Sequence, residues 1–180
     1  MTRIAARVLV WAAVACLYSG CILVGDFGAL WNRDALDGAL AGRWVSTELG
    51  ETDLKEMAFV RRGNAYGWIT TGDDIAYMKK FDTVRTVRAG GSSFLLLRAQ
   101  GVAGGMMVAY RVTRDRLELL AVPDVPGGEG LPPAPPSVDY TGHSEVPPTV
   151  RIKTLDLTAV EWLAALHRLS TERTVFVRRR

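Results

Sequence analysis

The sequence predicts a mainly β domain, an antiparallel small barrel or sandwich of about eight strands, with one C-terminal helix packed outside. Short β-rich runs recur between Gly, Asn and Asp turn signals at a spacing of roughly 8–12 residues, which is typical of such folds. All eight prolines fall between Pro123 and Pro148 and leave the other runs free to form sheet ladders. One amphipathic helix follows near the C-terminus.

Residues 1–20 have the three-part layout of a secretory signal that precedes this domain. Arg3 and Arg7 supply positive charge, residues 8–18 are apolar, and small residues follow at a peptidase site. A membrane-spanning helix is the alternative, but the apolar run of residues 8–24 lies at the short end of the roughly 17–25 residues that cross a bilayer. The sequence therefore favours cleavage.

Residues 17–21, Leu-Tyr-Ser-Gly-Cys, resemble the lipobox of bacterial lipoproteins. The resemblance implies that residues 1–20 are removed and that Cys21 receives a lipid, which holds the protein to a membrane. Tyr18 departs from the family pattern, which prefers Leu at that position. Cys16 is a rival acceptor, but it would leave an apolar region that is too short.

Cleavage before Cys21 changes what the composition implies. It lowers the formal net charge from +3 to +1, so the mature domain lacks the basic footprint of a nucleic-acid-binding protein. Cys21 would be its sole cysteine, which excludes a disulfide and a thiolate metal site. In bacterial lipoproteins, an aspartate directly after the lipidated cysteine is associated with retention in the inner membrane, and this chain has Ile22 there. The resemblance therefore implies that the protein lies in the cell envelope, at the periplasmic face of the outer membrane.

We expect residues 21–41 to form a membrane-proximal tether and residues 42–180 to form a single domain. The second half of the tether is expected to pack on the domain with a helical turn near residues 34–40, because apolar residues recur along it. The expected strands are residues 42–48, 55–61, 65–71, 74–79, 83–88, 93–98, 106–113 and 117–122, with another from Val150 and the last within 172–180. Alternation at residues 106–112 predicts one face in the core and one near water.

The chain then predicts a long loop and a helix. Residues 123–148 are expected to form a proline-rich excursion, in which residues 132–136 favour polyproline II. Residues 158–169 are expected to form the helix, with Thr158 and Glu161 as a capping box. Its apolar face predicts packing on the outside of the sheet.

Residues 42–44, Gly-Arg-Trp, stand at the start of the first expected strand and are similar to the Gly-x-Trp of lipocalin-like (calycin-type) barrels. The resemblance implies that Trp44 lies across the closed end of the barrel under an arginine from residues 178–180. Such an interior either fills with side chains or holds one small ligand. In the second case the aromatic candidates for ligand binding are Trp44, Tyr66, Trp68 and Tyr110.

No residue pattern predicts catalysis, a cofactor or a metal. His143 lies in residues 139–145, which we interpret as a solvated turn-rich loop, because a catalytic triad needs groups that converge on rigid elements. His167 is expected on the helix surface, near the C-terminal end of the helix dipole. Asp73 and Asp74 lack the further ligands of a calcium loop and read as a hairpin turn.

Two functions follow as expectations. The first is a membrane-anchored envelope lipoprotein without catalytic activity, acting as a structural or interaction module through an envelope protein partner that contacts the proline-rich segment. The alternative is a lipocalin-like carrier that binds a small apolar ligand in the barrel. A filled interior would favour the first function, and an open, aromatic-lined interior would favour the second.

Overall fold

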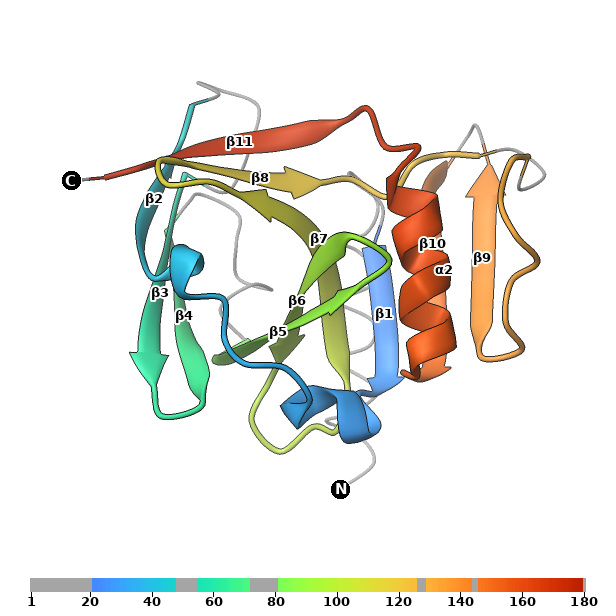
Figure 1. The fold of residues 1–180 in the computed structure, drawn as a ribbon, viewed down its shortest axis with the longest axis horizontal. Coiled ribbons are helices and arrows are strands. Elements are labelled where there is room, and N and C mark those ends of the chain that lie inside the picture. The colour runs from blue at the N-terminus through green and yellow to red at the C-terminus, as the bar shows by residue number, and fades with distance from the viewer. Residues whose placement is uncertain (1–20, 48–54, 72–80, 126–128, 144–145, 180) are drawn as a thin grey trace.

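The computed structural model describes residues 21–47, 55–71, 81–125, 129–143 and 146–179. Figure 1 shows a barrel with one helix on its outside and a small sheet extension beside that helix. In chain order the elements are β1 (Cys21–Asp26), η1 (Gly28–Asn32), η2 (Gly38–Leu40), β2 (Gly42–Ser46), β3 (Glu56–Arg62), β4 (Ala65–Thr71), β5 (Thr83–Ala89), β6 (Ser92–Arg98), β7 (Gly105–Val112), β8 (Arg116–Leu120), β9 (Val138–His143), β10 (Val146–Thr154), α2 (Leu157–His167) and β11 (Arg173–Arg178).

Eight antiparallel strands close the barrel, which confirms the predicted fold class. The order runs from β2 through β8 in sequence, β11 pairs with β8 and β2, and the β6–β7 ladder completes the circle. Closure removes the exposed edges that a flat sheet of this size would present. Helix α2 packs outside the barrel, against β5 and β6, as the sequence predicts.

Residues 21–41 are an integral part of the domain, so the predicted tether is wrong for its first half, where β1 joins the sheet, whereas its second half packs on the barrel with a helical turn, η2, as expected. Strand β1 pairs antiparallel with the first half of β7 and parallel with β10, and β9 extends this three-strand addition. The second half of β7 pairs with β8 instead, so β1 and β8 share one edge of β7. Ile22, Val24 and Phe27 are buried, which is the physical reason that this segment docks on the barrel.

Two hydrophobic cores lie on the two faces of the barrel wall. Alternate residues of β5, β6 and β7 point into the barrel or out beneath α2, and both sets are buried. On β6, Leu95 and Leu97 face inward while Phe94 and Leu96 face the helix. The prediction that one face of residues 106–112 lies near water is therefore wrong over the first half of β7, because Met107 and Ala109 belong to the outer core.

Helix α2 is confirmed, but its predicted cap and one of its predicted side-chain positions are wrong. The N-cap is Asp156, whose carboxylate accepts a hydrogen bond from the amide of Ala159 at 2.7 Å, so the Thr158–Glu161 capping box does not begin the helix. His167 is 2% exposed rather than on the surface, because its side of the helix packs on β6.

The proline-rich excursion is shorter than predicted, because its C-terminal part is strand rather than loop. Its C-terminal part forms β9 and the start of β10, so His143 ends a strand rather than lying in a loop. Pro147 and Pro148 lie within β10, against our expectation for prolines. The register of β10 on β9 shifts between Val146 and Thr149. At such a bulge the ladder hydrogen bonds are interrupted, so the amide donors that proline lacks are not needed there.

Several predictions lie outside the described residues: the signal segment with Cys16, the strand at residues 74–79, and Asp73 and Asp74. Within the part of the chain that the structure describes, no helix is long and apolar enough to cross a membrane.

Candidate functional site

The four aromatic residues proposed as ligand contacts all lie inside the barrel and belong to its core. Trp44, Tyr66, Trp68 and Tyr110 are 0%, 2%, 7% and 2% exposed. Phe59 packs edge-on between two of them, with ring centroids 6.0 Å from Tyr66 and 5.2 Å from Trp68. The inward-facing residues of the other barrel strands complete this core: Met57, Val84, Leu95, Leu97, Met106, Leu117 and Phe176. The interior around these rings is occupied by side chains.

Trp44 and Arg178 form the closure that the Gly-x-Trp resemblance implies, and this expectation is confirmed. The Arg178 guanidinium lies 4.3 Å from the centroid of the Trp44 ring. It donates hydrogen bonds to the carbonyl oxygens of Ala39 at 2.6 Å, Ala41 at 2.5 Å and Arg114 at 2.7 Å. One arginine thereby joins the segment before β2, the β7–β8 turn and β11.

Gly42 is required by the same closure. Its φ of +124° is a conformation that side chains rarely adopt, and a Cβ atom there would lie 2.8 Å from Nη1 of Arg178. The indole nitrogen of Trp44 donates to the carbonyl oxygen of Leu40 at 2.8 Å. Gly42 leaves room for the Arg178 guanidinium and Trp44 provides the ring on which it packs, so both residues of the motif position Arg178 across this end of the barrel.

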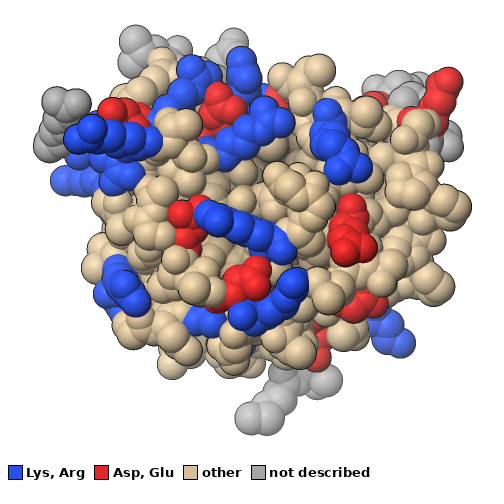
Figure 2. Space-filling view, in the orientation of Figure 1, with Lys and Arg blue, Asp and Glu red and all other residues tan. Residues whose placement is uncertain are grey.

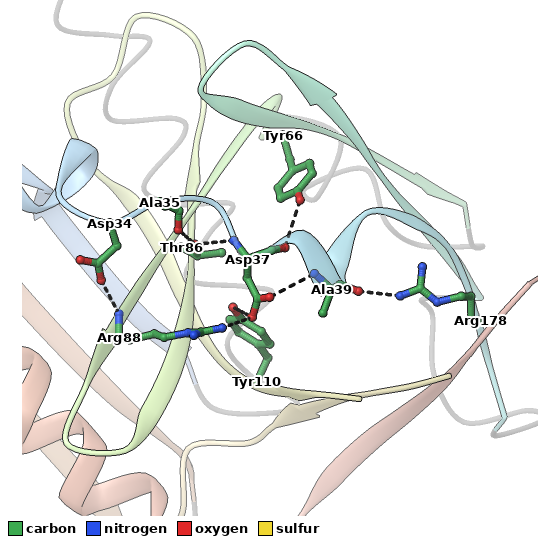
Figure 3. Close-up of polar contacts among 9 residues, drawn as sticks. All are labelled: Asp34, Ala35, Asp37, Ala39, Tyr66, Thr86, Arg88, Tyr110 and Arg178. Atoms are coloured by element: carbon green, nitrogen blue, oxygen red, sulfur yellow. Dashed lines mark hydrogen bonds and ion pairs between the residues drawn. The ribbon is translucent and has the colours of Figure 1, made fainter. Parts of the chain in front are cut away.

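Residues 34–41 lie over the same end and are held there by Asp37 (Figure 3). One Asp37 carboxylate oxygen accepts hydrogen bonds from Arg88 at 2.6 Å and from the Tyr110 hydroxyl at 3.0 Å. The other accepts from the amide of Ala39 at 3.1 Å and caps η2. The Asp37 carbonyl oxygen accepts from the Tyr66 hydroxyl at 3.0 Å. Asp37 therefore links the capping segment to β4, β5 and β7.

The ionisation states in this network are set by burial and by charge pairing. Partial burial opposes ionisation of Asp37, but the hydrogen bonds from Arg88, Ala39 and Tyr110 outweigh it, so the pKa of Asp37 is lowered. Burial and the nearby carboxylate raise the pKa of the Tyr110 phenol. At neutral pH Asp37 is therefore an anionic acceptor and Tyr110 a neutral donor, which matches the observed hydrogen bonds.

Asp37 is the acidic group in this network, and its carboxylate accepts structural hydrogen bonds from Arg88, Tyr110 and Ala39. The side chains of Cys21 and His143 fall outside what the structure describes. Across the described residues, no group of three or more His, Cys, Asp or Glu side chains could hold a metal ion.

Sequence reasoning found Trp44 and Arg178 but missed Asp37 and Arg88. The signal that was available is the pair Asp37-Gly38 between Leu36 and Leu40, since Asp is a favoured helix N-cap. Its partners come from β4, β5 and β7, and their convergence depends on barrel closure. A residue pattern along the chain does not reveal it.

The fold and this end of the barrel define a class of protein: a closed, eight-strand antiparallel β-barrel domain with a side-chain-filled interior, one sealed end and an outer helix. No protein-family model matches the chain, and comparison with curated proteins and with solved structures finds no match.

Proposed function

We propose that the protein is a lipid-anchored lipoprotein of the bacterial cell envelope, held through Cys21 at the periplasmic face of the outer membrane, and that its barrel is a non-catalytic interaction module. The observation that carries this proposal is the lipobox-like run Leu-Tyr-Ser-Gly-Cys at residues 17–21, which follows a positively charged and then an apolar stretch. Cleavage before Cys21 would put the lipid on a residue of β1, which pairs on both sides.

This position replaces the expected tether with a direct attachment. Because β1 is held between β7 and β10, no flexible spacer separates the lipid from the barrel. The proposed arrangement keeps the domain against the bilayer surface, where its partners are confined to proteins within close reach of the membrane.

The filled interior supports an interaction module over an apolar carrier. A carrier needs an internal cavity, whereas Trp44, Phe59 and Tyr110 and their neighbours occupy the barrel as a close-packed core. Acidic and basic side chains are interspersed on the face in Figure 2, and its upper edge carries basic side chains over β8 and β11. On these strands, Arg116 of β8 and Arg173 of β11 lie 2.8 and 3.8 Å from Glu118. This mixed pattern supports a protein partner rather than nucleic acid.

The lipid anchor has a direct test. Replacing Cys21 with alanine is expected to abolish both acylation and cleavage before residue 21, because the thiol is the lipid acceptor. The intact mass of the protein isolated from bacterial membranes would then equal that of the full 180-residue precursor.

Cys16→Ala is the matched control for this test, since it removes the rival thiol and should mature like the wild type. The proposal fails if Cys21→Ala still yields a lipid-bearing, shortened chain, or if Cys16→Ala is the variant that blocks maturation.

The exposed prolines are the proposed contact element for an envelope partner. The carbonyl oxygen of Pro132 accepts a hydrogen bond from the Trp162 indole at 2.9 Å, which fixes the segment to α2, while Pro133 and Pro136 are exposed. We expect Pro133→Ser with Pro136→Ser to reduce in-cell crosslinking to an envelope protein at least about tenfold, because the stiff presented segment is lost.

The control is Val60→Ser on the outer face of β3, where Val60 is 46% exposed and remote in the fold from the prolines. Both variants are to be compared at equal abundance and with equal circular dichroism. Unchanged crosslinking by the double proline variant would exclude the segment as the contact element.

A further inference from the structure

A cavity opens where β6 and β7 separate at the sealed end of the barrel. Their ladder ends with the pair Ser93–Tyr110, so Ser92, the first residue of β6, has no partner on β7. The cavity has a volume of about 450 Å³ and lies between the β5–β6 turn, β7 and the C-terminal end of α2. Pockets of 300–1,000 Å³ are typical for small molecules. Its size therefore fits a small ligand.

The charged groups around this cavity favour an anion. Arg88, Arg111 and Arg168 line it, and Asp37 is the one carboxylate in its lining. Asp37 is already paired with Arg88 at 2.6 Å. Within the described ranges, neither Arg111 nor Arg168 has an ion-pair partner, so two positive charges are left to act on a ligand in a partly enclosed space.

His167 lies at the inner side of this cavity. Its Nδ1 lies 3.0 Å from the carbonyl oxygen of Leu163, which can only accept, so Nδ1 carries the proton. Nε2 is buried without a hydrogen-bond partner among the described residues and is not open to a ligand in the cavity. The arginine side chains are therefore the groups that can bind a ligand there.

We propose that this cavity binds a small organic anion, of the chemical class of carboxylates and phosphate esters. Arg111 and Arg168 hold the oxyanion. The site is distinct from the filled barrel interior and does not depend on the lipid anchor.

The test uses the full chain in nonionic detergent with glycerol 3-phosphate, citrate, inorganic phosphate and glycerol as probes. We expect saturable binding of glycerol 3-phosphate or citrate by calorimetry, weaker binding of inorganic phosphate, and none of glycerol. Arg111→Gln and Arg168→Gln should each weaken binding at least about tenfold, which is ordinary for a lost charge-assisted hydrogen bond.

Arg61→Gln on β3 is the matched control, because it removes the same charge from an exposed residue outside the cavity lining. Arg111 makes no side-chain hydrogen bond within the described residues, so its variant should keep the native fold. The proposal is overturned if neither organic anion saturates or if Arg111→Gln binds as tightly as Arg61→Gln.

Discussion

Replacement of Trp44 by alanine is expected to lower the free energy of unfolding by about 3–5 kcal/mol. Trp44 is fully buried, and its ring supports the Arg178 guanidinium at 4.3 Å. The substitution would leave a large cavity at the sealed end, remove the hydrogen bond to Leu40 and withdraw the surface on which the arginine lies. Denaturant unfolding followed by far-ultraviolet circular dichroism measures the loss.

Three further variants distinguish loss of the Trp44–Arg178 closure from a general loss of buried apolar surface. Ile69→Ala removes a large apolar side chain that is 52% exposed on β4, so its cost should stay below about 1 kcal/mol. Arg178→Ala and the double variant with Trp44→Ala complete a mutant cycle, in which we expect a coupling energy of about 0.5–3 kcal/mol. A coupling energy near zero would show that the stacked pair does not stabilise the closed end as a unit.

Acidification from about pH 6.5 to about pH 4 is expected to remove about 3 kcal/mol of stability through His167 alone. Burial lowers the pKa of His167 to about 4, outweighing its hydrogen bond to Leu163. The unfolded chain, with a histidine pKa near 6.5, takes up the proton first as the pH falls. The free energy of unfolding therefore decreases through this window and recovers as the pH rises.

The surroundings of His167 explain why its charged form is excluded. The ring lies edge-on to Phe94 at 5.6 Å, and the charged groups that share its cavity are Arg88, Arg111, Arg168 and the paired Asp37. His167→Phe should flatten the pH dependence between pH 6.5 and 4 relative to the wild type, because an apolar ring requires no proton. Equal slopes in urea-unfolding series of the two proteins would contradict the assignment to His167.

Patterns within short segments correctly predicted the strands and the helix that such segments determine. Alternating apolar residues and turn signals predicted most barrel strands, and helical periodicity predicted α2 to within two residues at its C-terminal end. Asp156 was missed as the cap because Thr158 offered a competing capping pattern, and only the backbone geometry decides between them. The prolines of β10 were misread because a bulge, which depends on the partner strand, accommodates them.

The candidate sites were less predictable because they join residues that lie far apart in sequence. Resemblance pointed to Trp44 and to an arginine near the C-terminus, and the structure selects Arg178. The links from Asp37 to Arg88 and Tyr110 span 51 and 73 residues, and no sequence period marks them. His167 was expected on the surface. In the structure, the outer faces of β5 and β6 are apolar and α2 covers them, and the sequence alone does not show this contact.

The sequence by itself determined the mainly β class, the outer helix and the position of Trp44 at the start of the first barrel strand, because period-two patterning, helix periodicity and a Gly-x-Trp triplet are properties of short segments. Only the tertiary structure decided that β1 belongs to the sheet, that the barrel interior is filled, and that a cationic cavity with a buried histidine lies beside the Asp37 network. These depend on strand order and barrel closure, which long-range burial and backbone pairing fix together.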